Sequence, residues 1–192
     1  MCAARTGQLL NLSSLANDCG ITHNTAKAWV GVLEASFILY LLQPHHKNFN
    51  KRLVKTPKLY FYDTGLVCAL LGITQSVKIE THPFRGALFE TFVMSEFVKQ
   101  RRNLGLPINL YFWRDKTGHE IDCLIDDGNK LIAIEIKSGS TLTNDSFKNI
   151  NDWRTISGDH KTRAFLVYAG GQTQHRQSLT VLDWRALATF KI

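Results

Sequence analysis

The pattern of apolar and polar positions divides the chain into two parts that meet near the polar stretch of residues 73–82. Two segments with helical spacing, followed by two short strands, fill residues 1–80, and this order predicts a winged helix-turn-helix domain. Residues 81–192 have the order helix, hairpin, helix, strand, strand, helix, which fits a mixed sheet with helices on both sides. The sequence therefore predicts an α/β (α+β) protein of two domains.

The helix-turn-helix pattern occupies residues 11–35. Asn11 and Thr22 are the predicted N-caps of the two helices, and Gly20 supplies the left-handed turn that ends the first one. The second helix has an apolar face that we expect to be buried: Ala26, Trp29, Val30 and Leu33. Its exposed residues best placed to contact bases are His23, Asn24 and Lys27.

A basic loop, residues 43–57, separates the predicted strands 37–42 and 58–62 and would form the wing. It contains no acid and four cations: Lys47, Lys51, Arg52 and Lys55. Contact with nucleic-acid phosphates would explain this composition, and so would a solvated loop that keeps a hairpin soluble. Because Lys27 is the only cation of the second helix, a protein-docking role for this domain stays open as well.

A β-hairpin with one charged face is predicted over residues 114–137. An Asp127-Gly128 step lies between two alternating apolar runs, which is a strong hairpin signal. With this step as the turn, Asp122 lies opposite Ala133. Three charged residues then share one face: Asp122, Glu135 and Lys137. The opposite face is the predicted core: Ile121, Cys123, Ile125, Ile132, Ile134 and Ile136.

A helix predicted over residues 84–101 places Glu90 on or beside its apolar stripe. The stripe consists of Leu88, Phe89, Phe92, Val93 and Phe97. A carboxylate in such a position needs a cation, a hydrogen-bond donor or a metal ion as its partner. Glu90 therefore joins the charged residues of the hairpin as a candidate site residue.

These residues resemble the motif of the PD-(D/E)XK nuclease superfamily, and the sequence around them is most similar to its resolvase-like branch. The resemblance implies a restriction-endonuclease-like fold and a bound Mg²⁺ or Mn²⁺ ion. Asp122 and Glu135 would be direct metal ligands, with the carbonyl of Ile136 as a third. Glu90 would bind a second metal ion or a metal-bound water. Lys137 would orient the water or stabilise the charge that develops on the phosphate.

Two further charged residues belong to this hypothesis. Glu120 is predicted on the same face as Glu135 and would lie next to the metal ligands without binding the metal ion itself. Lys148, in the next predicted helix, would contact the phosphate. The site thus combines a metal-binding and a phosphate-binding part.

The whole chain also resembles the C-terminal region of a large prokaryotic family of AAA-type ATPases. Four segments carry the resemblance: residues 3–7, 58–66, 85–90 and the hairpin. In that family an ATPase module precedes this region, whereas the present sequence contains no G-x-x-x-x-G-K-[ST] phosphate-binding loop. The resemblance therefore implies an ATPase module or partner that is supplied from elsewhere.

The amino-acid composition indicates what class of protein the chain belongs to. Apolar residues make up 44% and charged residues 20%, which are globular values. No apolar run approaches the ~20 residues of a transmembrane helix, and the N-terminus lacks the apolar core of a signal peptide, so we expect a cytoplasmic protein without a membrane partner. Four scattered cysteines without C-x-x-C spacing fit reduced thiols. The net charge of +7 suits a polyanionic partner such as DNA.

Two functions follow from the sequence. The first is a Mg²⁺-dependent DNA endonuclease that uses the winged helix as a docking arm, and cleavage of both strands would favour a homodimer. The second is a catalytically silent DNA- or protein-binding module of an ATPase. A transcription regulator would account for the helix-turn-helix but not for the charged site residues.

Overall fold

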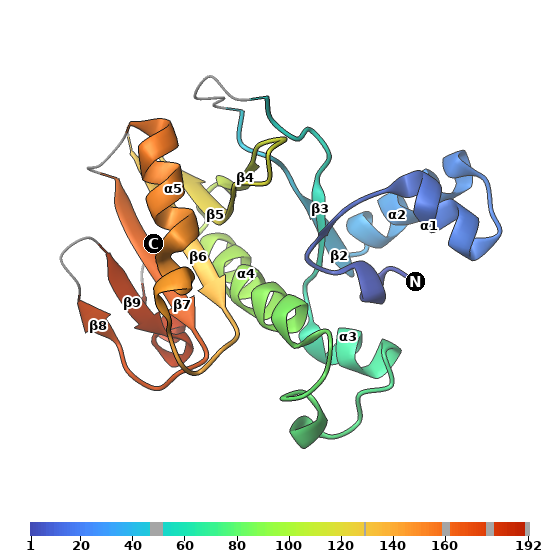
Figure 1. Ribbon diagram of the computed structural model, residues 1–192. Helices are drawn as coiled ribbons and strands as arrows, with labels where there is room; N and C mark the ends of the chain where they lie inside the picture. Colours follow the sequence, from blue (N-terminus) through green and yellow to red (C-terminus); the bar gives the residue numbers. More distant parts are fainter. Residues whose placement is uncertain (47–51, 129, 159–161, 176–178, 191–192) are drawn as a thin grey trace. The chain divides into compact units, whose positions relative to one another are not determined.

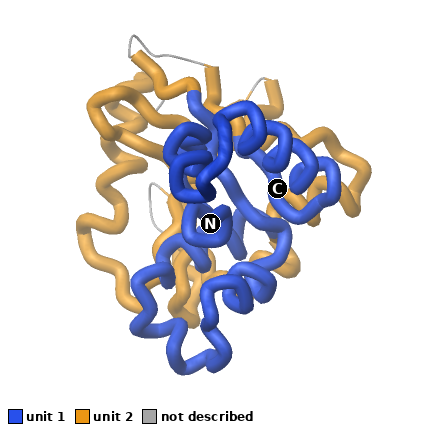
Figure 2. Tube along the Cα trace, turned by 90° about the vertical axis from the view of Figure 1, so that its right-hand side faces the viewer, with its two compact units in different colours: residues 1–42, 56–95 blue, residues 43–55, 96–192 orange. Residues whose placement is uncertain are grey.

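The computed structural model describes residues 1–46, 52–128, 130–158, 162–175 and 179–190. The chain forms two compact units, shown in two colours in Figure 2: residues 1–42 with 56–95, and residues 43–55 with 96–192. The first unit contains a three-stranded antiparallel sheet and the second a six-stranded mixed sheet. Because helices accompany both sheets, the predicted α/β (α+β) class is confirmed. Within the described residues, no helix is both long and apolar enough to cross a bilayer.

The first unit contains the predicted pair of helices, α1 (Leu12–Cys19) and α2 (His23–Ala35). The side chains of Asn11 and Thr22 accept hydrogen bonds from the backbone N–H groups three residues further on, at 2.9 and 3.1 Å, so both predicted N-caps are confirmed. Gly20 ends α1 at a φ of 64°, as the sequence predicts. These local signals decide where both helices begin and where the first one ends.

The sheet of the first unit has the strand order β1-β3-β2. Its strands are β1 (Gln8–Leu9), β2 (Leu39–Leu42) and β3 (Lys58–Phe61). Helix α3 (Thr64–Leu70) was not predicted from the sequence, and Asp63 caps it by accepting the N–H of Leu66 at 2.7 Å. Short 3-10 helices complete the unit: η1 (Ala3–Arg5) and η2 (Ser76–Lys78). The core of this unit includes Leu15, Val30, Leu39, Leu59, Phe61 and Val67.

Trp29 departs from the predicted apolar face of α2. Ala26 and Val30 are buried, as predicted, but 57% of Trp29 is exposed. Successive helical residues are about 100° apart, which places Trp29 at one edge of the face formed by Ala26, Val30 and Leu33. The indole lines an apolar cavity together with these three residues instead of being buried among them.

The second unit is built on a sheet with the strand order β4-β5-β6-β7-β9-β8. Strands β4 to β6 are antiparallel, β6, β7 and β9 are parallel, and β8 is antiparallel to β9. The strands are β4 (Leu110–Arg114), β5 (Glu120–Asp126), β6 (Leu131–Lys137), β7 (Arg163–Tyr168), β8 (Gln174–His175) and β9 (Thr180–Asp183). In the described part of the chain, the last strand in sequence order, β9, begins at Thr180.

Helices accompany the strands of this sheet. They are α4 (Arg85–Asn103), η3 (Asn144–Phe147), α5 (Lys148–Ser157) and η4 (Trp184–Ala188), of which α4 begins in the first unit and ends in the second. Helix α5 covers one face of the sheet (Figure 1). Its residues Ile150 and Trp153 are buried in one cluster with Ala133 of β6 and Leu166 of β7. This helix therefore closes over the strand that carries Glu135.

The first arm of the predicted hairpin, residues 114–125, contains a second turn that sequence analysis missed. The chain reverses between β4 and β5, so that Arg114 pairs with Glu120. Asp115 stabilises this turn, because its buried carboxylate accepts the N–H groups of Thr117 at 2.8 Å and His119 at 3.0 Å. The hydrogen-bonding side chain, not the apolar pattern, therefore sets the end of β4.

Asp115→Ala is expected to destabilise the protein by about 2–4 kcal/mol, because the N–H groups of the turn lose their acceptor. Burial alone would raise the pKa of Asp115, but the hydrogen bonds from Thr117 and His119 outweigh burial and hold this pKa below its usual range. The folded-state pKa is thus lower than the unfolded-state value of about 3.9. The stabilisation is present above that pH and is lost as the pH falls through the folded-state pKa.

Urea denaturation between neutral and acidic pH tests this expectation. The free energy of unfolding should fall in acid for the wild type and stay flatter for Asp115→Ala. Parallel pH curves for the two proteins would contradict the role assigned to this carboxylate.

The ends of the predicted wing, residues 43–57, pair with β4. Pro44 forms a parallel bridge with Phe112, and Leu53 forms an antiparallel bridge with Asp115. The N–H of His45 donates to the carbonyl of Phe112 at 2.7 Å. The described ends of this segment therefore bridge to the first strand of the large sheet, which the sequence, from which a wing was predicted here, did not indicate.

Candidate functional site

The β5–β6 hairpin reverses one residue later than predicted. The N–H of Asp127 donates to the carbonyl of Lys130 at 3.1 Å, so the reversal lies after Asp127 and not at the predicted Asp127-Gly128 step. The neighbouring Asp126 explains this shift. Its carboxylate accepts the N–H of Gly128 at 2.8 Å and lies 2.8 Å from Nε2 of the buried His45. Contact with His45 holds the pKa of Asp126 below its usual range.

The later turn changes the pairing of the two strands. Ala133 pairs with Leu124, so the predicted pairing of Ala133 with Asp122 is wrong. The pairing is displaced by two residues, and because side chains alternate with a period of two, such a shift keeps each residue of β6 on its predicted face. The β5–β6 ladder runs from Cys123↔Ile134 to the turn. Asp122 therefore lies just beyond the end of this ladder.

A β-bulge sits at Asp122. Tyr111 of β4 pairs with Leu124, and Trp113 pairs with Ile121, so the single residue between them on β4 faces both Asp122 and Cys123. The bulge interrupts the alternation that sequence analysis assumed. Ile121 accordingly belongs to the same buried cluster as Leu124, and not to the predicted face that it would share with Cys123. Bulges are common beside functional sites, where they redirect a side chain.

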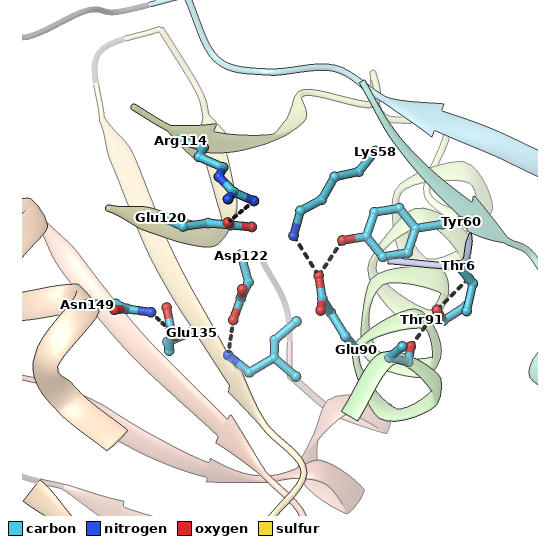
Figure 3. Close-up of polar contacts among 12 residues, drawn as sticks. Thr6, Lys58, Tyr60, Glu90, Thr91, Arg114, Glu120, Asp122, Glu135 and Asn149 are labelled. Atoms are coloured by element: carbon cyan, nitrogen blue, oxygen red, sulfur yellow. Dashed lines mark hydrogen bonds and ion pairs between the residues drawn. The ribbon is translucent and has the colours of Figure 1, made fainter. Parts of the chain in front are cut away.

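The redirected carboxylate of Asp122 reaches strand β6. Its Oδ2 accepts the backbone N–H of Ile136 at 2.8 Å, as Figure 3 shows. This contact brings the Asp122 carboxylate next to the Glu135-Ile136-Lys137 triplet in a region where the two backbones do not pair with each other. The carboxylate of Asp122 thus takes the place of a backbone acceptor from β5.

Glu135 is a fully buried carboxylate. Its Oε1 accepts hydrogen bonds from Lys137 Nζ at 2.6 Å and from Asn149 Nδ2 at 2.7 Å. Its Oε2 is also buried and has no hydrogen-bond partner among the residues that the structure describes. Burial raises the pKa of Glu135 against the opposing influence of Lys137 and Asn149. A buried carboxylate oxygen without a hydrogen-bond donor or a cation costs free energy.

Asn149 was missed by sequence analysis. It lies in the first turn of α5 and reaches Glu135 across 14 residues of sequence. No short-range pattern marks it, because an asparagine near a helix start is more often a capping residue. Glu120, the additional acid of the predicted site, forms an ion pair with Arg114 at 3.1 Å.

Glu90 belongs to the first unit, whereas the hairpin residues belong to the second. Its Oε1 accepts hydrogen bonds from Lys58 Nζ at 3.0 Å and from the hydroxyl of Tyr60 (Figure 3). The side chain of Lys58 is only 5% exposed and that of Glu90 19% exposed. Glu90 therefore has the cationic partner that its position requires. Its convergence with Asp122 and Glu135 stays a prediction.

The donor set fits a hard divalent cation. In the described part of the chain, no three acidic, histidine or cysteine side chains gather into a ready-made metal cage. Mg²⁺ does not require one, because it is usually held by one or two carboxylates and keeps several waters. A buried carboxylate oxygen without a donor, on a strand next to a redirected aspartate, is the kind of ligand that such an ion takes.

The residues predicted to contact nucleic acid are spread over both units. His23, Asn24 and Lys27 are exposed on α2, as predicted for base contact. Arg52 and Lys55 are exposed in the segment that pairs with β4, and Lys148 is the exposed first residue of α5. Lys47 and Lys51 lie outside the described residues. Exposure is compatible with phosphate contact, and it is equally the usual state of lysine and arginine.

Fold and site together define an α+β protein with a carboxylate–lysine site at a bulged hairpin of its larger sheet. Residues 85–187, which include this hairpin, match the family model described as a domain of unknown function (DUF4143). The chain belongs to this family. Residues 1–77 match a second domain of unknown function (DUF8612).

Two curated relatives have a comparable sequence over much of the chain. They are the uncharacterized protein Rv2008c of Mycobacterium tuberculosis and the uncharacterized protein Mb2031c of Mycobacterium bovis. Each is 33% identical over 141 residues, which cover 73% of this chain and 31% of the relative. The match thus takes in about a third of the length of these relatives.

Proposed function

We propose that the second unit is a divalent-metal-dependent phosphodiesterase of the PD-(D/E)XK nuclease type, with DNA as its substrate. The observation that supports this most strongly is Glu135, whose buried Oε2 has no hydrogen-bond partner among the described residues while Lys137 and Asn149 both bind its Oε1. A protein that needed this carboxylate only for stability would satisfy both oxygens or replace it with an apolar residue. A cation bound at Oε2 would account for the arrangement.

Each residue of the site then has a distinct task. Asp122 and Glu135 would hold Mg²⁺ or Mn²⁺, with the Ile136 carbonyl as a further ligand. When bound, the ion neutralises phosphate charge and lowers the pKa of the attacking water. Asn149 fixes the orientation of the Glu135 carboxylate through Oε1. Lys137, whose side chain is one-third exposed, can turn its ammonium group toward a phosphate oxygen.

We further propose that the protein works with an AAA-type ATPase, as an attached module or as a partner. The support is the resemblance of the four segments noted above and the greater length of the mycobacterial relatives. If catalysis is absent, the same chain would serve this ATPase as a binding module for DNA or protein. The exposed apolar part of α2 favours a protein ligand for the first unit in that case.

Glu135→Gln is the variant that tests metal binding most directly. In the wild type, Mg²⁺ at about 100 times its dissociation constant should stabilise the fold by ~2.7 kcal/mol. Glutamine keeps the oxygen that accepts from Asn149 but loses the negative charge, so this stabilisation should disappear. The readout is the melting temperature with and without Mg²⁺, supported by titration calorimetry with Mn²⁺. Equal stabilisation of both proteins by the metal ion would contradict the proposed site.

The same variant predicts a pH dependence without metal. The folded-state pKa of Glu135 lies above the unfolded-state value of about 4.3, because burial disfavours the charged form. The contribution of Glu135 to stability is thus fully present below that pH and is lost as the pH rises through the folded-state pKa. Glu135→Gln should remove this loss, so that the variant equals or exceeds the metal-free wild type in stability at neutral pH.

A further inference from the structure

The outward face of α2 is built largely from small side chains. Asn24, Ala28, Gly31 and Ala35 follow one another along it at intervals of four, three and four residues, and all four are exposed. Val32, which is 62% exposed, flanks this line on one side. The same spacing marks the contact positions of a helix that packs lengthwise against another helix. We refer to these four residues as the α2 seam.

Gly31 is the most informative residue of the seam. A glycine inside a helix costs roughly 0.5–1 kcal/mol relative to alanine. Gly31 has no positive φ, and a Cβ atom added to it would meet nothing within 4 Å. Neither the backbone nor the packing of the described residues therefore requires glycine here. A glycine that its own chain does not need is explained by the close approach of a second backbone.

Two charged residues on the other flank of the seam indicate which helix could supply this second backbone. Lys27 and Glu34 are both exposed and are seven residues apart, so they lie on the same side of the helix. If a second α2 packs antiparallel, Lys27 of each copy faces Glu34 of the other, next to a layer in which Ala28 meets Gly31. Glu34 accepts the N–H of Leu41 through Oε1 at 3.3 Å, which holds its carboxylate on this flank.

We propose that the α2 seam is the contact surface for a second copy of this chain, with the two helices antiparallel. The charge pattern is self-complementary, as a two-fold symmetric interface requires. The small side chains permit a close interhelical distance, and Val32 extends the apolar contact. Duplex DNA fits this face less well, because Glu34 offsets Lys27 and the seam beyond Asn24 offers no side-chain hydrogen-bond donor. The proposal does not depend on the metal site.

Charge reversal in the full chain tests the pairing. Sedimentation equilibrium over a concentration series should show the wild type approaching twice its chain mass of 21.8 kDa. Lys27→Glu and Glu34→Lys should each raise the dissociation constant about 10-fold, because two attractive pairs become repulsive. An equimolar mixture of the two variants should form a mixed dimer, and the double variant should regain wild-type affinity. Lys99→Glu, on α4, is the matched control and should change nothing.

Gly31 supplies a second, steric test. Gly31→Leu should block association, whereas Gly31→Ala should be tolerated and should raise the melting temperature of the monomer. Circular dichroism checks that both variants fold. A wild type that stays monomeric throughout the series, or a dimer insensitive to both charge reversals, overturns the proposal. Loss of duplex-DNA binding by Lys27→Glu without a change in mass also overturns it and assigns the face to DNA.

Discussion

Asp122→Ala should abolish metal-dependent nicking of DNA while the protein stays folded. The substitution removes one of the two carboxylates proposed to hold the cation, and Mg²⁺ bound by few protein ligands does not tolerate the loss of one. The variant also loses the acceptor for the N–H of Ile136, so a modest fall in stability accompanies it, of about 1–2 kcal/mol. Plasmid and branched DNA incubated with Mg²⁺ or Mn²⁺ provide the measurement, and EDTA should stop the reaction.

Lys137→Ala separates charge stabilisation from metal binding. The cation should still bind, but the cleavage rate should fall by ~10²–10³, the effect of losing one preorganised charge stabiliser. Lys116→Ala, an exposed lysine in the turn before β5, is the control and should cleave at the wild-type rate. Equal nicking by wild type and Asp122→Ala would point to a contaminating nuclease. No cleavage of linear, branched or single-stranded DNA by the wild type would leave the silent binding module as the function.

Lys58→Met should destabilise the first unit by about 3–5 kcal/mol, the largest effect on stability that we expect from one substitution. Methionine keeps the apolar stem of Lys58 but removes the charge, so that, among the residues that the structure describes, the hydroxyl of Tyr60 is left as the donor to the half-buried carboxylate of Glu90. Chemical denaturation of Lys58→Met, Glu90→Gln and the double variant measures the interaction. The double variant should lose less than the sum of the two single losses.

The pair formed by Lys99 and Glu96 provides the comparison. It has a shorter N–O distance, 2.6 Å against 3.0 Å, but the side chain of Lys99 is 49% exposed. Exposed pairs contribute about 0–1 kcal/mol, so Lys99→Ala should have little effect. Similar losses from Lys58→Met and Lys99→Ala would mean that burial does not determine the strength of the Lys58–Glu90 interaction.

The sequence predicts those features whose cause is local. Both helix N-caps and the Gly20 turn follow from side chains within three or four residues of the backbone groups that they satisfy. The β5–β6 hairpin was expected for the same reason. Its register was not, because Asp126 is fixed by His45, which lies 81 residues earlier in the chain. A contact of that separation leaves no trace in a local pattern.

The candidate site likewise combines features that the local sequence predicts with features that depend on distant residues. The spacing of Asp122, Glu135 and Lys137 could be predicted, but the features that make Glu135 unusual could not. Its burial depends on α5, its orientation on Asn149, and the position of Asp122 on a bulge opposite Phe112. The partners of Glu90, which lies on α4, come likewise from a distant part of the sequence, strand β3. All of these contacts depend on tertiary packing, and the local sequence pattern identifies only one of the two residues in each contact.

The pairing of residues 43–46 and 52–55 with β4 also bears on how the protein avoids aggregation. Strand β4 is the first strand of its sheet, and its outward carbonyl and N–H groups would otherwise be open to another chain. Phe112 instead exchanges hydrogen bonds with Gln43 and His45, and the carbonyl of Arg114 accepts the N–H of Val54. Changes in the length of this basic segment would therefore be limited by the need to keep both ends on the strand. Shortening it enough to release them would turn a protected sheet edge into a template for fibrils.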